Sequence, residues 1–179
     1  MNELTSVAID PRGTAYVVWG DHRDGYVASS DDGGRTWSTP TNFNTPPLGA
    51  VIHPTVAANR PGEVEVAWYG TSVYGDANDG QVMGQPLSPS GAAWYVYWAR
   101  STDAGHSFGI PLRETPLVHR GRICTQGLLC LPDNSRNLAD DFGMVIDPAT
   151  GLTTIAYTTD DGYLTANDAY TAVAAQVQH

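Results

Sequence analysis

The stretch Ser30-Asp31-Asp32-Gly33-Gly34-Arg35-Thr36-Trp37 returns in altered form as Ser101-Thr102-Asp103-Ala104-Gly105-His106-Ser107-Phe108. Both copies read Ser-x-Asp-x-Gly-x-(Thr/Ser)-aromatic. Each copy follows a run of strand-forming residues and leads into a segment that contains a proline, Pro40 or Pro111. A pattern that recurs in two matching settings predicts two equivalent turns between strands.

Every residue type in this pattern has a structural role. A tight turn needs a residue that tolerates positive φ, and the glycine supplies it. The Asp side chain accepts backbone N–H groups inside the turn, and the hydroxyls do so more weakly. The aromatic side chain can fold back over the hairpin and bury apolar surface. We therefore assign a structural role to Ser30, Asp32, Gly34, Trp37, Ser101, Asp103, Gly105 and Phe108, with ligand binding by Asp32 or Asp103 as the alternative.

The octapeptide resembles the Asp-box, or bacterial neuraminidase repeat, of sialidases and related β-propellers. The resemblance is specific for the fold and carries little information about function. It implies an all-β chain with the architecture of a sialidase-type propeller.

Internal repetition extends beyond the two boxes. Residues 7–19, 55–68 and 144–157 each read as a strand, a turn and a second strand, with Trp19, Trp68 and Tyr157 in matching places. A third strand follows in each unit at 26–29, 93–100 and, less clearly, 163–166. The third unit has no recognisable box, so we interpret 165–170 as a degenerate hairpin and 172–177 as a closing strand, with a helix as the alternative for this Ala-rich end. The prediction is three four-stranded blades in one partial domain, at about 5–45, 52–115 and 140–179.

Sialidase propellers have six blades, so three blades are half of a ring. Either the chain is a fragment of a longer propeller, or two copies associate as a homodimer that completes the ring. Uncovered blade faces and unpaired strand edges both favour association. The alternating apolar residues of 64–68 and 94–98 indicate half-buried strands, and in a lone chain they would meet water at the ends of the row.

Composition limits the classes of partner. Asp and Glu number 19 against 9 basic residues, for a formal net charge of −10, and every basic residue is Arg. Nucleic acids and anionic membranes are therefore not expected partners, because no positive potential attracts phosphate. No stretch approaches the ~20 apolar residues of a membrane span. Met1-Asn2-Glu3 lacks the basic start and apolar run of a secretion signal.

Cys124 and Cys130 are the two cysteines of the chain. A metal site would need further ligands at suitable spacing, so we predict no metal here. A small disulfide loop is favoured over free thiols, and it indicates a secreted or extracytoplasmic setting. The start at Met1 would then be an artificial boundary, or the chain would be a fragment of a longer secreted protein.

Strand order assigns the loops to two ends of the molecule. The first-to-second turns and the boxes share one end, and the long loops 21–24, 70–91, 111–141 and 159–161 share the other, where sialidase-like propellers place their sites. Long loops without strand signal are often functional. Within them, 76–80 faintly resembles a calcium loop without its closing Glu, so calcium is a minor alternative to our expectation of no cofactor. Asp140-Asp141, just before an innermost strand, would bring carboxylates near the axis, unless they form a solvated turn.

Active sialidases resemble one another in three arginines that hold the sugar carboxylate, a Tyr nucleophile paired with a Glu, and an Asp acid/base. The first arginine belongs to an Arg-Ile-Pro motif, but this chain has Gly109-Ile110-Pro111. The four glutamates, at 3, 63, 65 and 114, fall on strands or near blade edges, so no partner for a Tyr nucleophile is visible. The candidate ligand-binding residues are Arg23, Tyr69, Tyr74, Arg120, Arg122 and Asp141, with Tyr69 and Tyr74 as possible nucleophiles.

Three functions remain from the sequence. The first is a non-catalytic sialidase-like module that provides a scaffold or a weak glycan-recognition face. The second is part of a secreted glycoside hydrolase of exo-sialidase type, with its other catalytic groups in missing blades or a partner subunit. The third is a purely structural fragment. The missing Arg-Ile-Pro and Glu favour the first; the ligand, catalytic competence and biological role do not follow from these residues.

Overall fold

The computed structural model describes residues 5–126, 130, 138, 141–160 and 171–177, and the side chains of these residues up to 160. The chain is all-β, with three antiparallel sheets and one short helix in the described part. That helix, α1 (Gly80–Met83), begins where the Asp79 side chain accepts a hydrogen bond from the Gln81 N–H at 2.8 Å. None of the described helices is long and apolar enough to cross a membrane.

The first sheet is a meander in the order β1-β2-β3-β4. Its strands are β1 (Ser6–Ile9), β2 (Ala15–Gly20), β3 (Gly25–Ser30) and β4 (Thr41–Asn42). The second sheet has the order β5-β6-β7-β8, and β9 also pairs with β7. Its strands are β5 (Ala50–Arg60), β6 (Glu63–Thr71), β7 (Ala93–Ser101), β8 (Leu112–Arg113) and β9 (His119–Arg120).

The third sheet contains β10 (Gly143–Ile146), β11 (Thr153–Thr159) and β12 (Thr171–Val177), in that order. Here the sequence prediction needs correction. The strand predicted at 163–166 lies outside the described residues. The closing strand predicted at 172–177 is β12, and Thr171–Val177 pairs directly with β11 along its whole length, where the third strand of the sheet was expected. The Ala-rich end is a strand, so the helical alternative is wrong.

The first two sheets share one register. In the first, Ala15 pairs with Ser30 and Trp19 with Tyr26. In the second, Val64 pairs with Ser101 and Trp68 with Tyr97. The Trp therefore lies four residues after the partner of the motif Ser in both sheets. Both pairs also stack, with ring centroids 5.7 Å apart for Trp19 and Tyr26 and 6.1 Å for Trp68 and Tyr97. Equivalent pairs of this kind indicate that the two sheets repeat one unit.

The third sheet continues the same spacing. Thr153 pairs with Val177 and Tyr157 with Val173, so Tyr157 stands four residues beyond Thr153 as Trp19 stands beyond Ala15. The predicted match between Trp19, Trp68 and Tyr157 therefore agrees with the pairing.

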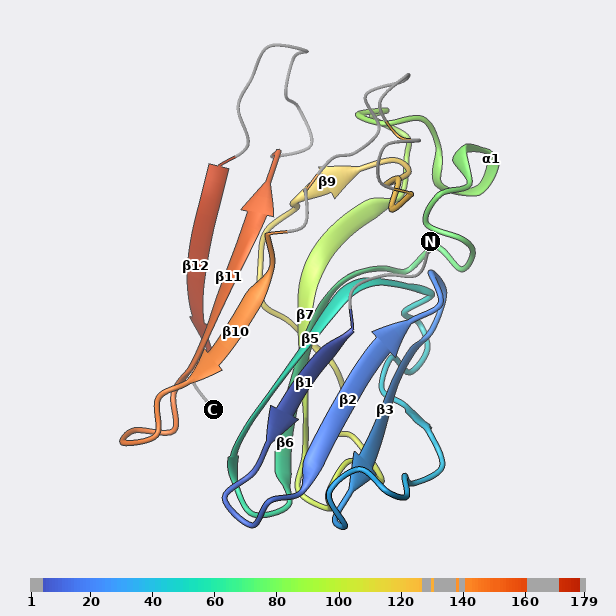
Figure 1. Cartoon of the computed structure of the whole chain (residues 1–179). Coiled ribbons are helices and arrows are strands. Elements are labelled where there is room, and N and C mark those ends of the chain that lie inside the picture. Colours follow the sequence, from blue (N-terminus) through green and yellow to red (C-terminus); the bar gives the residue numbers. More distant parts are fainter. Residues whose placement is uncertain (1–4, 127–129, 131–137, 139–140, 161–170, 178–179) are drawn as a thin grey trace.

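The second sheet lies between the other two, as Figure 1 shows. Along β6, Val64, Val66 and Trp68 pack in a cluster with the first sheet, whereas Ala67 and Tyr69 pack in a cluster with Ile155 and Tyr157 of the third. We expected the apolar residues of β6 and β7 to make half-buried strands that meet water at the ends of the row. For β6 that expectation is wrong, because both of its faces are covered and Trp68 is fully buried. β7 does alternate between buried and half-buried residues, but Trp94 and Trp98 pack in the cluster with the third sheet and do not meet water.

Apolar surface is exposed instead on the outer sheets. Val7 and Ile9 of β1 are 60% and 63% exposed, and Val145 of β10 is 61% exposed. Their strand neighbours alternate with them and point inward: the Ser6 hydroxyl lies 3.4 Å from that of Thr55 on β5. The two outer faces are therefore the ones that no described part of the chain covers.

The two predicted eight-residue turns have the same hydrogen bonds. The Ser30 hydroxyl donates to Asp32 at 2.9 Å and accepts from the Gly34 N–H at 2.9 Å. The Ser101 hydroxyl does the same with Asp103 and with the Gly105 N–H, at 2.7 and 2.9 Å. Each Asp also accepts from the backbone and hydroxyl of the residue four positions later, Thr36 or Ser107. Gly34 and Gly105 have φ of 83° and 80°, as a tight turn requires.

The two aromatic residues of these turns differ. Phe108 packs against the cluster between the first and second sheets. Trp37, which was expected to cover its hairpin, remains 45% exposed.

Short turns and long loops do lie at opposite ends of the sheets, as expected from strand order. The turn end holds the β1–β2 and β5–β6 turns and the second octapeptide, which the structure links: Gly62 N–H donates to Asp10 at 2.8 Å, and Ala104 N–H donates to the Gly62 carbonyl at 2.9 Å. The loop end holds α1 and β9, near the upper edge of Figure 1. Cys124 and Cys130 form the predicted disulfide, with Cα atoms 5.7 Å apart.

Candidate functional site at the loop end

The β2–β3 turn begins the loop end. The Asp21 carboxylate accepts the N–H groups of Arg23 and Asp24 at 3.0 and 2.8 Å, an arrangement in which a short acidic side chain closes a turn. His22, between them, has a φ of 75°, in the left-handed region that non-glycine residues seldom occupy. Its side chain is thereby directed away from β2 and β3, toward two distant loops.

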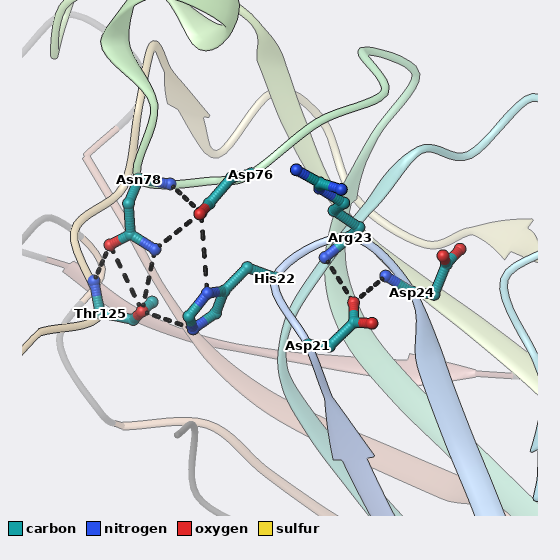
Figure 2. A network of polar contacts seen from close by, with 7 residues as sticks. All are labelled: Asp21, His22, Arg23, Asp24, Asp76, Asn78 and Thr125. Carbon is teal, nitrogen blue, oxygen red and sulfur yellow. Dashed lines mark hydrogen bonds and ion pairs between the residues drawn. The ribbon is translucent and has the colours of Figure 1, made fainter. Parts of the chain in front are cut away.

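Three segments far apart in the sequence meet at His22 (Figure 2). His22 Nε2 lies 3.1 Å from the Thr125 hydroxyl, and Nδ1 lies 3.7 Å from Asp76 Oδ1. Asn78 connects Asp76 to Thr125. Its backbone N–H and its Nδ2 both donate to Asp76 at 2.9 Å, and its Oδ1 accepts from the Thr125 N–H at 2.8 Å. Thr125 directly follows the disulfide-bonded Cys124, so the disulfide braces this network.

The order Thr125, His22, Asp76 is that of a nucleophile, a base and a carboxylate that orients the base. The distances do not support that chemistry. The 3.7 Å between His22 and Asp76 exceeds the ~2.6–3.2 Å at which a carboxylate holds an imidazole, and both Thr125 and Asp76 are already occupied by Asn78. The network therefore holds three loops together.

Electrostatics agree with that role. Burial alone would raise the pKa of Asp76, but hydrogen bonds from the backbone and side chain of Asn78, with the charges of His22 and Arg23, bring the pKa below its ordinary value. Asp76 is therefore an ionised acceptor. No group of three or more His, Cys, Asp or Glu side chains within the described ranges is placed to hold a metal ion. In the loop once compared with a calcium site, Asp79 caps α1.

Two of the predicted ligand-binding residues are exposed at this end. Arg23 follows His22 in the turn, and Tyr74 is 66% exposed in the loop after β6. Tyr74 lines a groove of about 480 Å³ together with Asp24 and Asn42 and with the chain from Asn44 to Gly49. The structure thus brings Tyr74 and the Asp24 side of the β2–β3 turn together.

Tyr69 lies elsewhere than expected. The side chain has no exposed surface, and its hydroxyl accepts from the Thr158 N–H at 2.8 Å and donates to the Thr158 carbonyl at 3.1 Å. Burial raises its pKa to about 12. A tyrosine in this position ties β6 to β11 and presents no hydroxyl to a ligand.

The remaining candidates are dispersed. Arg120, on β9, is half-buried and donates to the Gly91 carbonyl at 3.4 Å. Arg122 is half-buried against the α1 segment, where its N–H donates to the Gly84 carbonyl at 2.9 Å. Asp141 is exposed just before β10. None of the three lines the Tyr74 groove.

A buried ionisable pair lies below these loops. His119 Nδ1 on β9 is 2.6 Å from Asp160 Oδ2 at the end of β11, and neither side chain is exposed. His119 Nε2 faces the Arg122 carbonyl at 3.3 Å. The pair joins the second and third sheets and is closed to a ligand. Asp160, predicted on a surface loop, is therefore part of the interior.

Sequence reasoning missed a hollow where the first strands of the sheets meet. This space, about 330 Å³, is lined in part by Ser6, His53 and Phe142. His53 has a φ of 50° at an irregularity in β5, directly before Pro54. Residues held in such conformations gather at functional sites. Asp141 directly precedes Phe142 and is exposed, and its predicted position near a propeller axis stays a prediction.

Sequence reasoning also missed Asp24, Asn42 and Asn44. A usable signal was present, since Asn42-Phe43-Asn44 follows the first octapeptide with amides on both sides of a fully buried Phe. The pairing of Asn42 with Tyr26 then places these amides beside the β2–β3 turn.

Comparison with known proteins concerns the fold. No protein-family model matches the chain, and no curated protein sequence does. Among solved structures, a protein of unknown function from Dyadobacter fermentans matches with a TM-score of 0.60 and 16% identity, over 98% of this chain and 51% of that one. A Hadza microbial sialidase matches with a TM-score of 0.54 and 16% identity, over 89% of this chain and 32% of that one.

An ulvan lyase from a polysaccharide lyase family also matches, at a TM-score of 0.44 and 14% identity, over 94% of this chain and 42% of that one. The chain thus spans about half of the first structure and a third of the second. At such identities the first two matches show a shared fold and leave activity open.

Proposed function

We propose that the three sheets are successive blades of a sialidase-like propeller, and that the chain recognises carbohydrate through its loop end without catalysis. The shared register of Trp19–Tyr26 and Trp68–Tyr97 supports the repeat of one blade. The position of the second sheet, covered on both faces, supports stacking of blades in a row. The fold likeness to a sialidase is consistent with both.

One observation carries the functional part: the loop end presents an exposed Tyr74 beside a mostly apolar groove that also contains Asp24 and Asn42, on loops held by the His22 network. At the turn end, by contrast, the carboxylates of Asp32 and Asp103 accept hydrogen bonds from residues of their own turns. Aromatic faces and fixed polar groups are what a sugar ring needs for stacking and hydrogen bonding. The loop end therefore suits recognition.

The distribution of glutamates speaks against catalysis by this chain. Glu63 and Glu65 lie on β6 near the turn end, where both are engaged: Glu63 pairs with Arg100, and Glu65 accepts from the Trp98 indole at 2.9 Å. Within the described residues, no glutamate is hydrogen-bonded to Tyr69 or Tyr74. A Tyr nucleophile needs such a base, so a non-catalytic role is preferred.

The alternative is part of a glycoside hydrolase whose other catalytic groups lie outside this chain. The hollow beside His53, with Asp141 next to its lining residue Phe142, favours it. In a closed propeller, the first strands of the blades surround the axis, so this hollow would open toward a central site shared with other blades.

The setting and partners follow the same reasoning. The Cys124–Cys130 disulfide favours a secreted or extracytoplasmic location. The uncovered faces at Val7, Ile9 and Val145 favour contact with further blades, either from a second copy of this chain or from a longer chain. We prefer the second copy, which would close a six-bladed ring.

A glycan array probed with the disulfide-bonded protein, run beside a fluorogenic α-sialoside assay, tests the proposal. Binding to at least one class of glycan and no fluorophore release above the blank are expected. Combined Arg23→Ala and Tyr74→Ala substitution should remove binding, whereas Asp32→Ala should lower the melting temperature and leave binding intact.

Three results would contradict the proposal. Absence of binding to every glycan would leave only a structural role. Loss of binding in a folded Asp32→Ala variant would move the site to the turn end. Fluorophore release that disappears in Tyr74→Phe would establish the hydrolase alternative.

A further inference from the structure

The groove beside Tyr74 is lined by a set of residues that differ from those of a sialic acid site. It runs between the β2–β3 turn and the segment after β4, and about 480 Å³ is in the range of small-ligand sites. Its lining residues are Asp24, Asn42, Asn44, Thr45, Pro46, Pro47, Leu48, Gly49 and Tyr74. The exposed lining is mostly apolar, and the half-buried Asp24 and the exposed Asn42 are the residues that bring a carboxylate or an amide to its surface.

The polar groups of the groove are held in place before any ligand arrives. Asn44 Oδ1 accepts the Gly25 N–H at 2.7 Å, and Asn42 Oδ1 accepts the Asn44 N–H at 2.8 Å. Asn42 Nδ2 donates to Asp24 Oδ1 at 3.2 Å. The other Asp24 carboxylate oxygen has no hydrogen-bond partner among the described residues. A fixed carboxylate oxygen with spare acceptor capacity is suited to receive a pair of hydroxyl groups.

Tyr74 is seated on the backbone beneath it. The Gly75 N–H donates to the Gly49 carbonyl at 3.2 Å. A methyl group at Gly49 would lie 2.5 Å from Tyr74 Cα, so the close approach of these two loops requires glycine there. The 66% exposed ring is therefore presented by a fixed backbone, and such a ring offers its face to the C–H face of a sugar.

The charge of the groove decides the class of sugar. Asp24 is the one charged residue in its lining. Arg23, the neighbouring cation, acts on Asp76, and Figure 2 shows its side chain apart from the Asp24 carboxylate. An anionic sugar placed here would meet a carboxylate without a compensating cation, on a chain of net charge −10. An uncharged sugar meets no such penalty.

We propose that this groove binds a neutral pyranose ring, stacked on Tyr74 and hydrogen-bonded through adjacent hydroxyls to Asp24 and Asn42. The inference rests on the proposed function of the loop end and names its ligand class. It also separates this groove from any site for anionic sugars on the propeller axis.

Isothermal titration calorimetry on the intact, disulfide-bonded protein tests the inference. The probes are methyl β-D-galactopyranoside and methyl α-D-mannopyranoside as neutral rings, and the methyl α-glycoside of N-acetylneuraminic acid as the anionic one. At least one neutral probe should bind, and the anionic probe should bind at least about tenfold more weakly. Tyr74→Ala should raise the Kd of the neutral probe about tenfold or more, the loss expected for one stacked ring.

Two further variants separate the contributions. Tyr74→Phe keeps the ring and should retain binding within about threefold. Asp24→Asn removes the charge. It should raise the Kd of the neutral probe and reduce the ratio between the Kd of the anionic probe and that of the neutral one. Trp37→Ala removes an exposed aromatic residue at the turn end and should leave every Kd unchanged, with circular dichroism as the check on folding.

The outcomes are distinguishable. Neutral binding that survives Tyr74→Ala, or equal loss in Trp37→Ala, would overturn the groove assignment while leaving glycan recognition by the chain in place. Tighter binding of the anionic probe would overturn the ligand class. Failure of all three probes and of the glycan array would contradict the inference and the proposed function together.

Discussion

At the scale of single residues, Asp32 and Asp103 show why a sequence motif can predict a fold and still give no information about function. The Asp32 carboxylate accepts four hydrogen bonds and the Asp103 carboxylate three, all within their own turns. Hydrogen bonds from Thr36 lower the pKa of Asp32 from its ordinary 3.8 to about 2, and hydrogen bonds from Ser107 lower that of Asp103 to about 2 as well. The hydrogen bonds of each side chain are therefore explained by its turn, without a ligand.

From these two lowered pKa values we predict how the melting temperature changes at acid pH. A carboxyl group whose pKa is lower in the folded state stabilises the fold above its unfolded pKa, and the effect is lost as pH falls through the folded pKa. The melting temperature of the wild-type protein should therefore fall as pH drops from about 4 to about 2. The Asp32→Asn/Asp103→Asn variant has lost this contribution at neutral pH already.

Differential scanning calorimetry at pH 7, 4, 3 and 2 compares the two proteins. Their difference in melting temperature should be largest at pH 7 and shrink toward pH 2; carboxylates such as Asp10 and Asp76 titrate in both and cancel. A constant difference across that range would show that the two carboxylates are not ionised acceptors.

At this scale, prediction from sequence succeeded where one residue type has one local task. Positive φ at Gly34 and Gly105 follows from turn geometry alone. The burial of Tyr69 did not follow from the sequence, because its hydroxyl is bonded to Thr158, which lies far along the chain on another sheet. No local pattern reveals that contact. Asp24 was missed for the same reason: its groove needs Asn42 and Tyr74, which only the fold brings near.

At the scale of elements, the two Asp-Pro turns show that the same local structure can contribute differently to stability, depending on what surrounds it. Asp10-Pro11 and Asp147-Pro148 begin similar turns in the first and third sheets. Asp10 is 4% exposed and accepts from the N–H groups of Arg12, Thr14 and Gly62 and from the Tyr16 hydroxyl. Asp147 is exposed and accepts only within its own turn among the described contacts.

Asp10→Ala should therefore destabilise far more than Asp147→Ala. It leaves the Gly62 N–H and the Tyr16 hydroxyl without a buried acceptor, which costs roughly 3 kcal/mol of unfolding free energy. For a chain of this size that corresponds to a fall of roughly 6–12 °C in melting temperature. Thermal melts of both variants measure the difference; equal effects would show that the Asp10 link between the first two sheets contributes nothing.

The Cys124–Cys130 disulfide closes a short loop beside Thr125. By loop-closure entropy, a loop of this length contributes about 2 kcal/mol. Reduction should therefore lower the melting temperature and loosen the Thr125–His22 contact. Intact mass of the unreduced, alkylated protein should lack both thiol hydrogens and any alkyl group. Two alkylated cysteines in native protein would contradict the bond.

The sequence predicted which segments are strands better than it predicted how many strands each sheet contains. The paired strands of the first two sheets carry their own turn signals, so their order follows from the sequence. The third unit of the sequence has no octapeptide, so no local pattern showed that Thr171–Val177 is the strand that pairs with β11.

At the scale of the whole molecule, the arrangement is a row of three sheets with a buried middle. Sequence alternation could not reveal this, because a strand covered by neighbours on both sides and one covered on a single side can both carry alternating residues. The glutamates of β6 masked its burial: Glu65 is 5% exposed and is accommodated by the Trp98 indole and the Thr153 hydroxyl. Among the described strands, the outer sheets leave apolar residues uncovered at the ends of the row, at Val7 and Ile9 on one side and Val145 on the other.

The proposed six-bladed ring depends most on these uncovered faces. Each copy would offer one first-sheet face and one third-sheet face, so a two-fold pair satisfies both at once. Sedimentation equilibrium of the disulfide-bonded protein, across dilution into the micromolar range, tests this directly. A dimer is predicted, shifted toward monomer by Val7→Asp/Ile9→Asp and left unchanged by Trp37→Asp at the turn end. A stable, well-folded monomer at micromolar concentration would contradict the closed ring and leave a segment of a longer propeller.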